Sequence, residues 1–208
     1  MKKGILIGCG VLACIAVLVA VVAVITGIGT YNRLVGLDEQ VKTAWAQVEN
    51  VYQRRADLIP NLVNTVEGAA DFERSTLTDV IEARSRATAV QLTPEMLGDP
   101  QAFARFEQAQ NGLGSALSRL MVVIERYPEL KANQNFIQLQ DELAGTENRI
   151  AVERRRFNET AQQYNSTVRR FPTVFLARWF GFDERAYFQA TPGAEEAPEV
   201  EFNFREQN

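Results

Sequence analysis

The sequence predicts an all-α protein in which an N-terminal transmembrane helix continues into an antiparallel helical bundle of three long helices and a short fourth. The first observation behind this is an apolar run at residues 4–28 that contains no charged side chain. The second is that apolar residues recur at spacings of three and four along most of the remaining chain, which is the period of a helix with one buried face. We therefore predict an anchor at 1–30, a bundle at 31–190 and an acidic, disordered tail at 191–208.

The apolar run has 25 residues. As a helix it measures roughly 37 Å, enough to cross a hydrocarbon core of about 30 Å with some tilt. A cleaved signal peptide is the first alternative, but its apolar core is shorter and no A-x-A site ends this run. Lipid attachment at Cys9 or Cys14 and a buried core helix are two further alternatives. A membrane-spanning helix fits the length and the lack of a polar face best.

Small side chains recur at spacings of four and three inside the run. These residues are Cys9, Ala13, Ala16, Ala20, Ala23 and Gly27. Such a stripe lets two helices approach closely in lipid, so we expect it to mediate self-association. The alternative is that alanines of a lipid-facing helix fall in phase by chance. The same phase continues beyond the membrane through Leu34, Leu37 and Val41, which indicates one uninterrupted helix.

Composition narrows the function. The net charge is −4, and no basic surface suited to nucleic acid is present. The chain has no histidine, so the usual general base and the usual transition-metal ligand are missing, and we expect no cofactor or metal. Both cysteines lie in the apolar run. The short basic N-terminus, Lys2 and Lys3, favours a cytoplasmic N-terminus and an extracytoplasmic body, although Arg33 and Lys42 follow closely on the other side.

The first soluble segment, 31 to about 89, has a helical pattern interrupted by Pro60. Because the apolar phase resumes beyond the proline without a polar loop, we predict a kink and no chain reversal. Arg54 and Arg55 precede it, with Asp57 as their nearby partner; the alternative is a solvated charged turn.

The next boundaries are marked by prolines. Thr93-Pro94 and Asp99-Pro100 each have the form of an N-cap followed by a first helical residue, which predicts a connection at 91–100. A helix follows at 101–126, in which Gly112 and Gly114 are either weak points or sites of close approach. A third helix is predicted from Pro128 to Arg170, closed by Phe171-Pro172.

Residues 173–190 are rich in aromatic side chains. We expect a short helix to Phe180 that ends at Gly181, with its rings capping one end of the bundle. The alternative is contact with the membrane interface, where Trp and Tyr are favoured. In the tail, residues 200–204 alternate apolar and polar side chains, which could pair with the sheet edge of a partner.

Several strings along the chain resemble the LemA family of bacterial membrane proteins. They are Tyr31-Asn32-Arg33-Leu34-Val35, Arg54-Arg55-Ala56-Asp57-Leu58-Ile59-Pro60-Asn61-Leu62-Val63, Tyr127-Pro128-Glu129-Leu130-Lys131-Ala132-Asn133, Glu147-Asn148-Arg149-Ile150 and Phe171-Pro172. The resemblance implies a single-pass protein whose soluble part is an antiparallel four-helix bundle, and it supplies no reaction. Some relatives are tied to the organisation of magnetosome membranes. The matching positions are our candidate structural or interaction residues, namely Arg55, Asp57, Pro60, Asn61, Asn133, Glu147, Asn148, Phe171 and Pro172.

Three functions remain. The first is a membrane-anchored scaffold or interaction protein that self-associates or binds other membrane proteins, with a role in membrane or envelope organisation. The alternative is a ligand-responsive membrane sensor, with Asn133, Asn135, Asn148, Asn158 and Asn165 as its polar lining. The third is an enzyme that uses carboxylates of the bundle, drawn from Asp57, Glu67, Glu73 and Glu147 with Arg55 and Arg149. We favour a protein that is not an enzyme, because no catalytic constellation accompanies these carboxylates.

Overall fold

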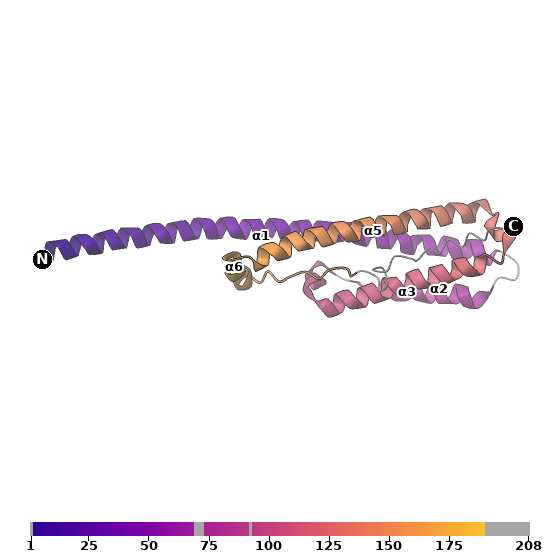
Figure 1. The fold of residues 1–208 in the computed structure, drawn as a ribbon. Coiled ribbons are helices and arrows are strands. Elements are labelled where there is room, and N and C mark those ends of the chain that lie inside the picture. Colours follow the sequence, from indigo (N-terminus) through magenta and orange to yellow (C-terminus); the bar gives the residue numbers. More distant parts are fainter. Residues whose placement is uncertain (1, 69–72, 92, 190–208) are drawn as a thin grey trace, which may run out of the picture.

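The computed structural model describes residues 2–68, 73–91 and 93–189, and over these ranges the chain is helical and contains no strand. Its helices are α1 (Lys2–Glu67), α2 (Arg74–Ala89), the 3₁₀ helix η1 (Pro94–Gly98), α3 (Pro100–Ile124), α4 (Pro128–Lys131), α5 (Gln134–Arg169) and α6 (Thr173–Phe180). The predicted all-α class is confirmed. Figure 1 shows α1 projecting far beyond one end of an elongated bundle made by the other helices and its own C-terminal half.

The bundle is antiparallel. α5 runs back along α1 over the longest interface, α2 packs mainly against α3, and α1 also contacts α2. The buried face of α1 begins where the apolar run ends, with Leu34, Leu37, Val41 and Trp45 all less than a tenth exposed. The stripe that is in phase with the small residues of the anchor therefore becomes the bundle seam as soon as α5 covers it.

Pro60 lies inside α1, which continues through it to Glu67 as predicted. A proline in a helix lacks the N–H that would bond the carbonyl four residues earlier, here that of Ala56. The Nε of Arg84, on α2, donates a 2.8 Å hydrogen bond to this Ala56 oxygen. The carbonyl freed by the proline is thus satisfied from a neighbouring helix.

The prediction of one kinked helix from residue 31 to 89 was wrong. α1 ends at Glu67, the backbone turns at Gly68, and α2 begins at Arg74 as a separate helix of the bundle. The apolar spacing of α2, with Leu77, Val80, Ala83 and Ala87 buried, has the same period as that of α1. Because periodicity is unchanged across the reversal, it could not reveal the turn.

One of the predicted proline boundaries, Asp99-Pro100, carries the expected side-chain cap. The side chain of Asp99 accepts hydrogen bonds from the backbone N–H groups of Gln101 (2.8 Å) and Ala102 (3.2 Å), with Pro100 as the first residue of α3. Thr93-Pro94 instead opens the short η1. Asn133 caps α5 by accepting from the N–H groups of residues 135 and 136.

The core consists of two hydrophobic clusters arranged along the bundle. The cluster nearer the anchor is aromatic and centred on Trp45, whose ring lies 5.2 Å from that of Phe106 and 5.6 Å from that of Phe157. The distal cluster is mainly aliphatic and includes Ile59 and Leu120, both fully buried. The two clusters are separated by a layer of polar side chains, which is described below.

The last described part of the chain, residues 171–189, turns back along the bundle, and the predicted tail at 191–208 lies outside the described residues. The Phe171–Pro172 peptide bond is cis, α6 follows it, and Gly181 ends α6 in the left-handed region with φ +74°, as predicted. Residues 182–189, hereafter the strap, then return along α5 without regular secondary structure (Figure 1). Of the aromatic residues expected to cap the bundle, Phe182 and Phe188 pack into the core, but the rings of α6 do not.

Candidate functional site

The polar layer between the two core clusters is centred on Arg55, whose residue is only 4% exposed. Its Nη1 lies 2.8 Å from Oε1 of Glu147 on α5, and its Nη2 donates to Oε1 (2.6 Å) and to the backbone oxygen (3.2 Å) of Gln110 on α3. Gln110 in turn donates to the carbonyl of Ala87 on α2 at 3.3 Å. One residue from each of the four main helices thus meets in a single layer.

This layer sets the register of the bundle. A buried charge is tolerated where its hydrogen bonds are made, and a slip of α3 or α5 by one turn along α1 would remove one of the two partners of the Arg55 guanidinium. Polar residues in helical cores are known to select register and partner in this way. Gly114 lies beside the layer, where an added Cβ would make only an ordinary van der Waals contact with the Arg55 guanidinium at 4.0 Å, and Gly112 faces open space, so neither glycine is required for close approach of a neighbouring helix.

The layer opens to solvent on one side. Arg55, Gln110 and Glu147 line an open cleft of about 480 Å³ together with Tyr52 and Arg154. The guanidinium of Arg55 also lies 5.1 Å from the centre of the Tyr52 ring. The cleft therefore presents a cation, a half-exposed carboxylate and an aromatic ring.

The strap is held on α5 by two asparagines. Nδ2 of Asn165 donates to the Arg185 carbonyl, and the Arg185 N–H donates back to Oδ1, both at 2.8 Å. Asn158 makes the same pair of bonds with Phe188, both at 2.9 Å. Asn158 and Asn165 are seven residues apart on α5, which is a rise of about 10.5 Å. Their partners Arg185 and Phe188 are three residues apart, and three extended residues span about 10 Å. The two distances match only if the strap is close to fully extended.

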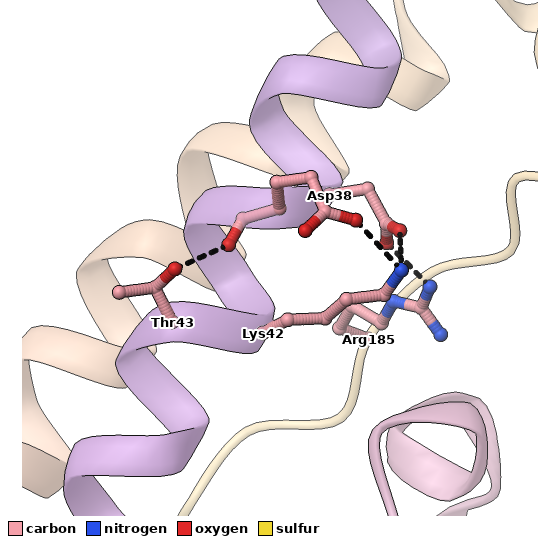
Figure 2. A network of polar contacts seen from close by, with 5 residues as sticks. Asp38, Lys42, Thr43 and Arg185 are labelled. Atoms are coloured by element: carbon pink, nitrogen blue, oxygen red, sulfur yellow. Dashed lines mark hydrogen bonds and ion pairs between the residues drawn. The ribbon is translucent and has the colours of Figure 1, made fainter.

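A second attachment joins the strap to α1. Figure 2 shows the carboxylate of Asp38 between the guanidinium of Arg185 (2.6 Å) and the ammonium of Lys42 (3.0 Å). Burial raises the pKa of Asp38, but the hydrogen bonds from Arg185 and Lys42 outweigh burial, so the pKa lies below its usual value. Arg185 also lies over the buried Tyr164, and burial raises the pKa of that phenol to about 12.

A third attachment, made by Arg154 and Glu107, holds the end of the strap. Arg154 contacts Oε1 of Glu107 at 2.9 Å and donates to the Gln189 carbonyl at 3.1 Å. Its guanidinium lies 4.5 Å from the centre of the Phe188 ring. Burial raises the pKa of Glu107, although Arg154 opposes the shift. The strap thus ties α1, α3 and α5 together across the aromatic cluster.

Comparison with known proteins identifies the family. The sequence profile of the LemA family matches residues 44–202, which is most of the chain. The chain belongs to the LemA family.

Similar proteins include magnetosome proteins and another LemA protein. Magnetosome protein MamQ of Magnetospirillum gryphiswaldense and magnetosome protein MamQ 2 of Paramagnetospirillum magneticum are each 29% identical over 197 residues, which is 87% of this chain and 72% of theirs. Protein LemA of Metamycoplasma hominis is 23% identical over 164 residues, covering 79% of this chain and 71% of its own. This LemA-family chain is therefore a membrane-associated helical protein.

The LemA-like string around Pro60 serves several separate purposes. Arg55 pairs with Glu147, which lies 92 residues away, and Asp57 instead accepts a 2.8 Å bond from Gln53, so the expected pairing of Asp57 with the arginines was wrong. Arg54 pairs on the surface with Glu142. Asn61 is exposed, and its carbonyl accepts the hydroxyl of Thr65. Of the candidate residues, only Arg55 and Glu147 are brought together.

The other candidates have structural positions. Asn133 caps α5, Asn148 is exposed on the same helix, and Pro172 immediately precedes α6. Phe171 is 75% exposed beside α6. The strap was missed by the sequence analysis; asparagines seven residues apart on one helix were its only signal.

The asparagines proposed as the lining of a sensor do not form one site. One is a cap, two hold the strap, and Asn135 and Asn148 are exposed. The carboxylates proposed for an enzyme are similarly dispersed, with Glu73 paired to Arg126 at 3.2 Å and far from the polar layer. Within the ranges that the structure describes, no cluster of three or more His, Cys, Asp or Glu side chains could hold a metal ion.

The described side chains in the apolar N-terminal part of α1 are almost all exposed in this LemA-family chain. In the described part of the chain, α1 is the one helix long and apolar enough to cross a membrane. Along the small-residue stripe, Ala16, Ala20 and Ala23 are exposed, and an added Cβ at Gly27 would meet nothing within 4 Å. The side chains of Cys9 and Ala13 lie outside the described residues.

Proposed function

We propose that this LemA-family protein is a membrane-anchored scaffold that positions a rigid helical bundle at a membrane surface and organises that membrane or envelope by binding copies of itself or other membrane proteins. The observation that carries the proposal is the continuity of α1, which runs from Lys2 to Glu67 without a break. Because the membrane segment and the bundle seam belong to one helix, the bundle cannot swivel freely about its anchor. A body oriented in this way suits a protein that presents a defined surface to partners.

Three features of the bundle support a structural role. The polar layer around Arg55 and the three attachments of the strap add rigidity and register. Among the described residues, the carboxylates are dispersed and form no constellation for acid–base chemistry. The names of the MamQ relatives place them at magnetosomes. We carry over to this chain only the association with an organised membrane.

We further propose that copies associate through the small-residue stripe of the anchor and that the bundle faces the extracytoplasmic side. Beyond Leu34 the same face of α1 is covered by α5, but within the apolar run no described part of the chain covers Ala16, Ala20, Ala23 or Gly27. Small residues on one face allow close van der Waals packing between helices in lipid. The two N-terminal lysines favour retention of that end in the cytoplasm.

The test uses the two natural cysteines in native membranes. Cys9 belongs to the stripe and Cys14 follows Ala13, about 100° away around the helix. The variant Cys14→Ser retains only the stripe cysteine and is expected to crosslink to a dimer on mild oxidation, whereas Cys9→Ser, the matched control, should not. Equal crosslinking of the two variants, or none by either, would contradict association through the stripe.

A separate experiment tests the scaffold itself. The full chain is purified from native membranes in mild detergent, and co-purifying proteins are compared between the wild type and a version in which the stripe alanines are replaced by leucine. A defined partner, or a discrete oligomer measured by light scattering, supports the proposal. A chain that is monomeric and alone at every detergent concentration would refute it.

The second candidate, a ligand-responsive sensor, rests on the open cleft beside Arg55. Its cation and its aromatic wall suit a small anionic ligand, which would compete with Glu147 for the guanidinium. Because Arg55 is on α1, such a ligand would act directly on the helix that enters the membrane. Thermal unfolding of the full chain in detergent with a panel of small carboxylates and phosphates tests this, with Glu147→Gln as the sensitised variant; no ligand-dependent rise in melting temperature in either form rules the sensor out.

A further inference from the structure

Helix α6 presents an aromatic face that the bundle does not cover. Phe171, Phe175 and Trp179 are 75%, 65% and 85% exposed. They recur every four residues, and the rings of Phe171 and Phe175 lie 5.9 Å apart, so they form one stripe. The opposite face of α6 is packed, with Ala177 fully buried. Aromatic side chains bury about 150–250 Å² each, so this stripe leaves several hundred Å² of apolar surface in contact with solvent, as much as marks an interaction site.

The stripe lies where α1 enters the membrane. In Figure 1, α6 is at the end of the bundle from which α1 projects. The ring of Tyr31 on α1 lies 4.9 Å from that of Phe180, the last residue of α6. Tyr31 follows Ile28, the last residue of the apolar run, by three positions, which is about 4.5 Å along a helix. At that distance α6 is at the level of the lipid headgroups.

The charges around α6 suit the same location. Arg33 on α1 and Arg170 and Arg178 beside the stripe are all exposed, and Arg169 reaches Glu184 of the strap at 3.8 Å. Guanidinium groups at this depth can bind the phosphates of lipid headgroups while the neighbouring aromatic rings enter the acyl boundary. Tryptophan and tyrosine are enriched at this boundary in membrane proteins because one end of each ring is apolar and the other polar.

We propose that α6 lies in the interface of the membrane that α1 crosses, with Phe171, Phe175 and Trp179 inserted among the lipids and the nearby arginines on their phosphates. The bundle is then attached to the bilayer at two points, through α1 and through α6. These two attachments fix both the tilt of the bundle relative to the membrane and its distance from the membrane surface. This arrangement does not depend on self-association of the anchor. The occupant of the stripe is lipid; a second copy of the chain is the alternative that the test distinguishes.

The test measures the fluorescence of Trp179 in the full chain, reconstituted into vesicles of phosphatidylcholine and anionic phosphatidylglycerol that contain brominated acyl chains. The protein has two tryptophans, and Trp45 is 2% exposed in the aromatic core. Subtracting the signal of the Trp179→Phe variant from that of the wild type isolates Trp179 without disturbing the core. We expect Trp179 to be blue-shifted, shielded from acrylamide and quenched by lipids brominated near the headgroup.

The control places a tryptophan at an equally exposed site at the far end of the bundle. Val122 on α3 is 71% exposed, so the double variant Trp179→Phe with Val122→Trp reports a surface ring away from the bilayer. It should be quenched by acrylamide and unaffected by brominated lipid. Circular dichroism of each variant verifies that the helices are retained.

Two outcomes would overturn the proposal. If Trp179 behaves as the Val122→Trp control does, the stripe is in water. If Trp179 is shielded from acrylamide but not quenched by lipid, and the shielding is lost when the protein is diluted with excess lipid, the stripe is covered by a second copy. Quenching by brominated lipid that persists on dilution supports insertion into the interface.

Discussion

The hydrogen bond between Arg84 and the Ala56 carbonyl makes a sharp prediction about Pro60. The perturbation is Arg84→Met, which keeps the length of the side chain and removes its donors. Ala56 is 4% exposed, so without Arg84 its carbonyl oxygen would lack a hydrogen-bond partner in a site that water hardly reaches. A hydrogen bond from a charged donor contributes about 1.5–3 kcal/mol, and we expect a loss of stability in that range.

The same substitution should be almost harmless when Pro60 is replaced by alanine. Pro60→Ala restores a backbone N–H at position 60, which can bond the Ala56 oxygen in the ordinary helical pattern. In that background Arg84→Met should cost about 0.5 kcal/mol or less. The coupling between the two positions is therefore expected to be about 1–3 kcal/mol, although the side chains belong to different helices.

The assay is urea unfolding of the full chain in detergent micelles, followed by far-ultraviolet circular dichroism, with the four chains of the cycle compared. The matched control is Arg86→Met on the same helix, whose arginine is 67% exposed and 3.5 Å from Glu82. Exposed pairs of this kind contribute little, so this control should change stability by less than about 0.5 kcal/mol. Equal costs of Arg84→Met with and without Pro60 would refute the reasoning.

Three further predictions concern the bundle and the strap. Arg55→Ala should cost about 2–4 kcal/mol in urea unfolding because the polar layer loses its centre, whereas Arg54→Ala, 59% exposed at its side chain, should cost less than about 1 kcal/mol; similar costs would contradict the role of burial. Asn165→Ala should release the strap, seen as faster hydrogen exchange of residues 182–189, while the exposed Asn148→Ala on the same helix leaves exchange unchanged. The pKa of Asp38 is lower in the folded protein than in the unfolded chain. Its contribution to the free energy of unfolding is therefore fully present above its unfolded pKa of about 4, and it is lost as the pH falls through the folded pKa. The difference in melting temperature between wild type and Asp38→Asn should thus be constant at neutral pH and shrink below about pH 4; a difference that is independent of pH would exclude an ionic role.

The presence of helices and the ends of several of them could be predicted from the sequence, because both depend on residues that are close together along the chain. An apolar period of three and four is set by the geometry of the helix itself, and the caps at Asp99 and Gly181 follow from backbone groups that only nearby side chains or a left-handed residue can satisfy. The continuity of α1 through Pro60 belongs to this class as well, since no loop-forming residues surround the proline.

The sequence by itself thus determined the long apolar N-terminal helix, the helical class and several helix boundaries, but not the break between α4 and α5 inside the helix predicted from Pro128 to Arg170. The tertiary structure alone decided the reversal after Glu67, the pairing of Arg55 with Glu147 and the attachment of the strap to Asn165. The reason is physical: the apolar period is the same on both sides of a turn, so it carries no sign of a change in direction. The partner of a buried polar group is likewise chosen by whatever lies within about 3 Å once the helices have packed, and no spacing along the chain encodes that distance.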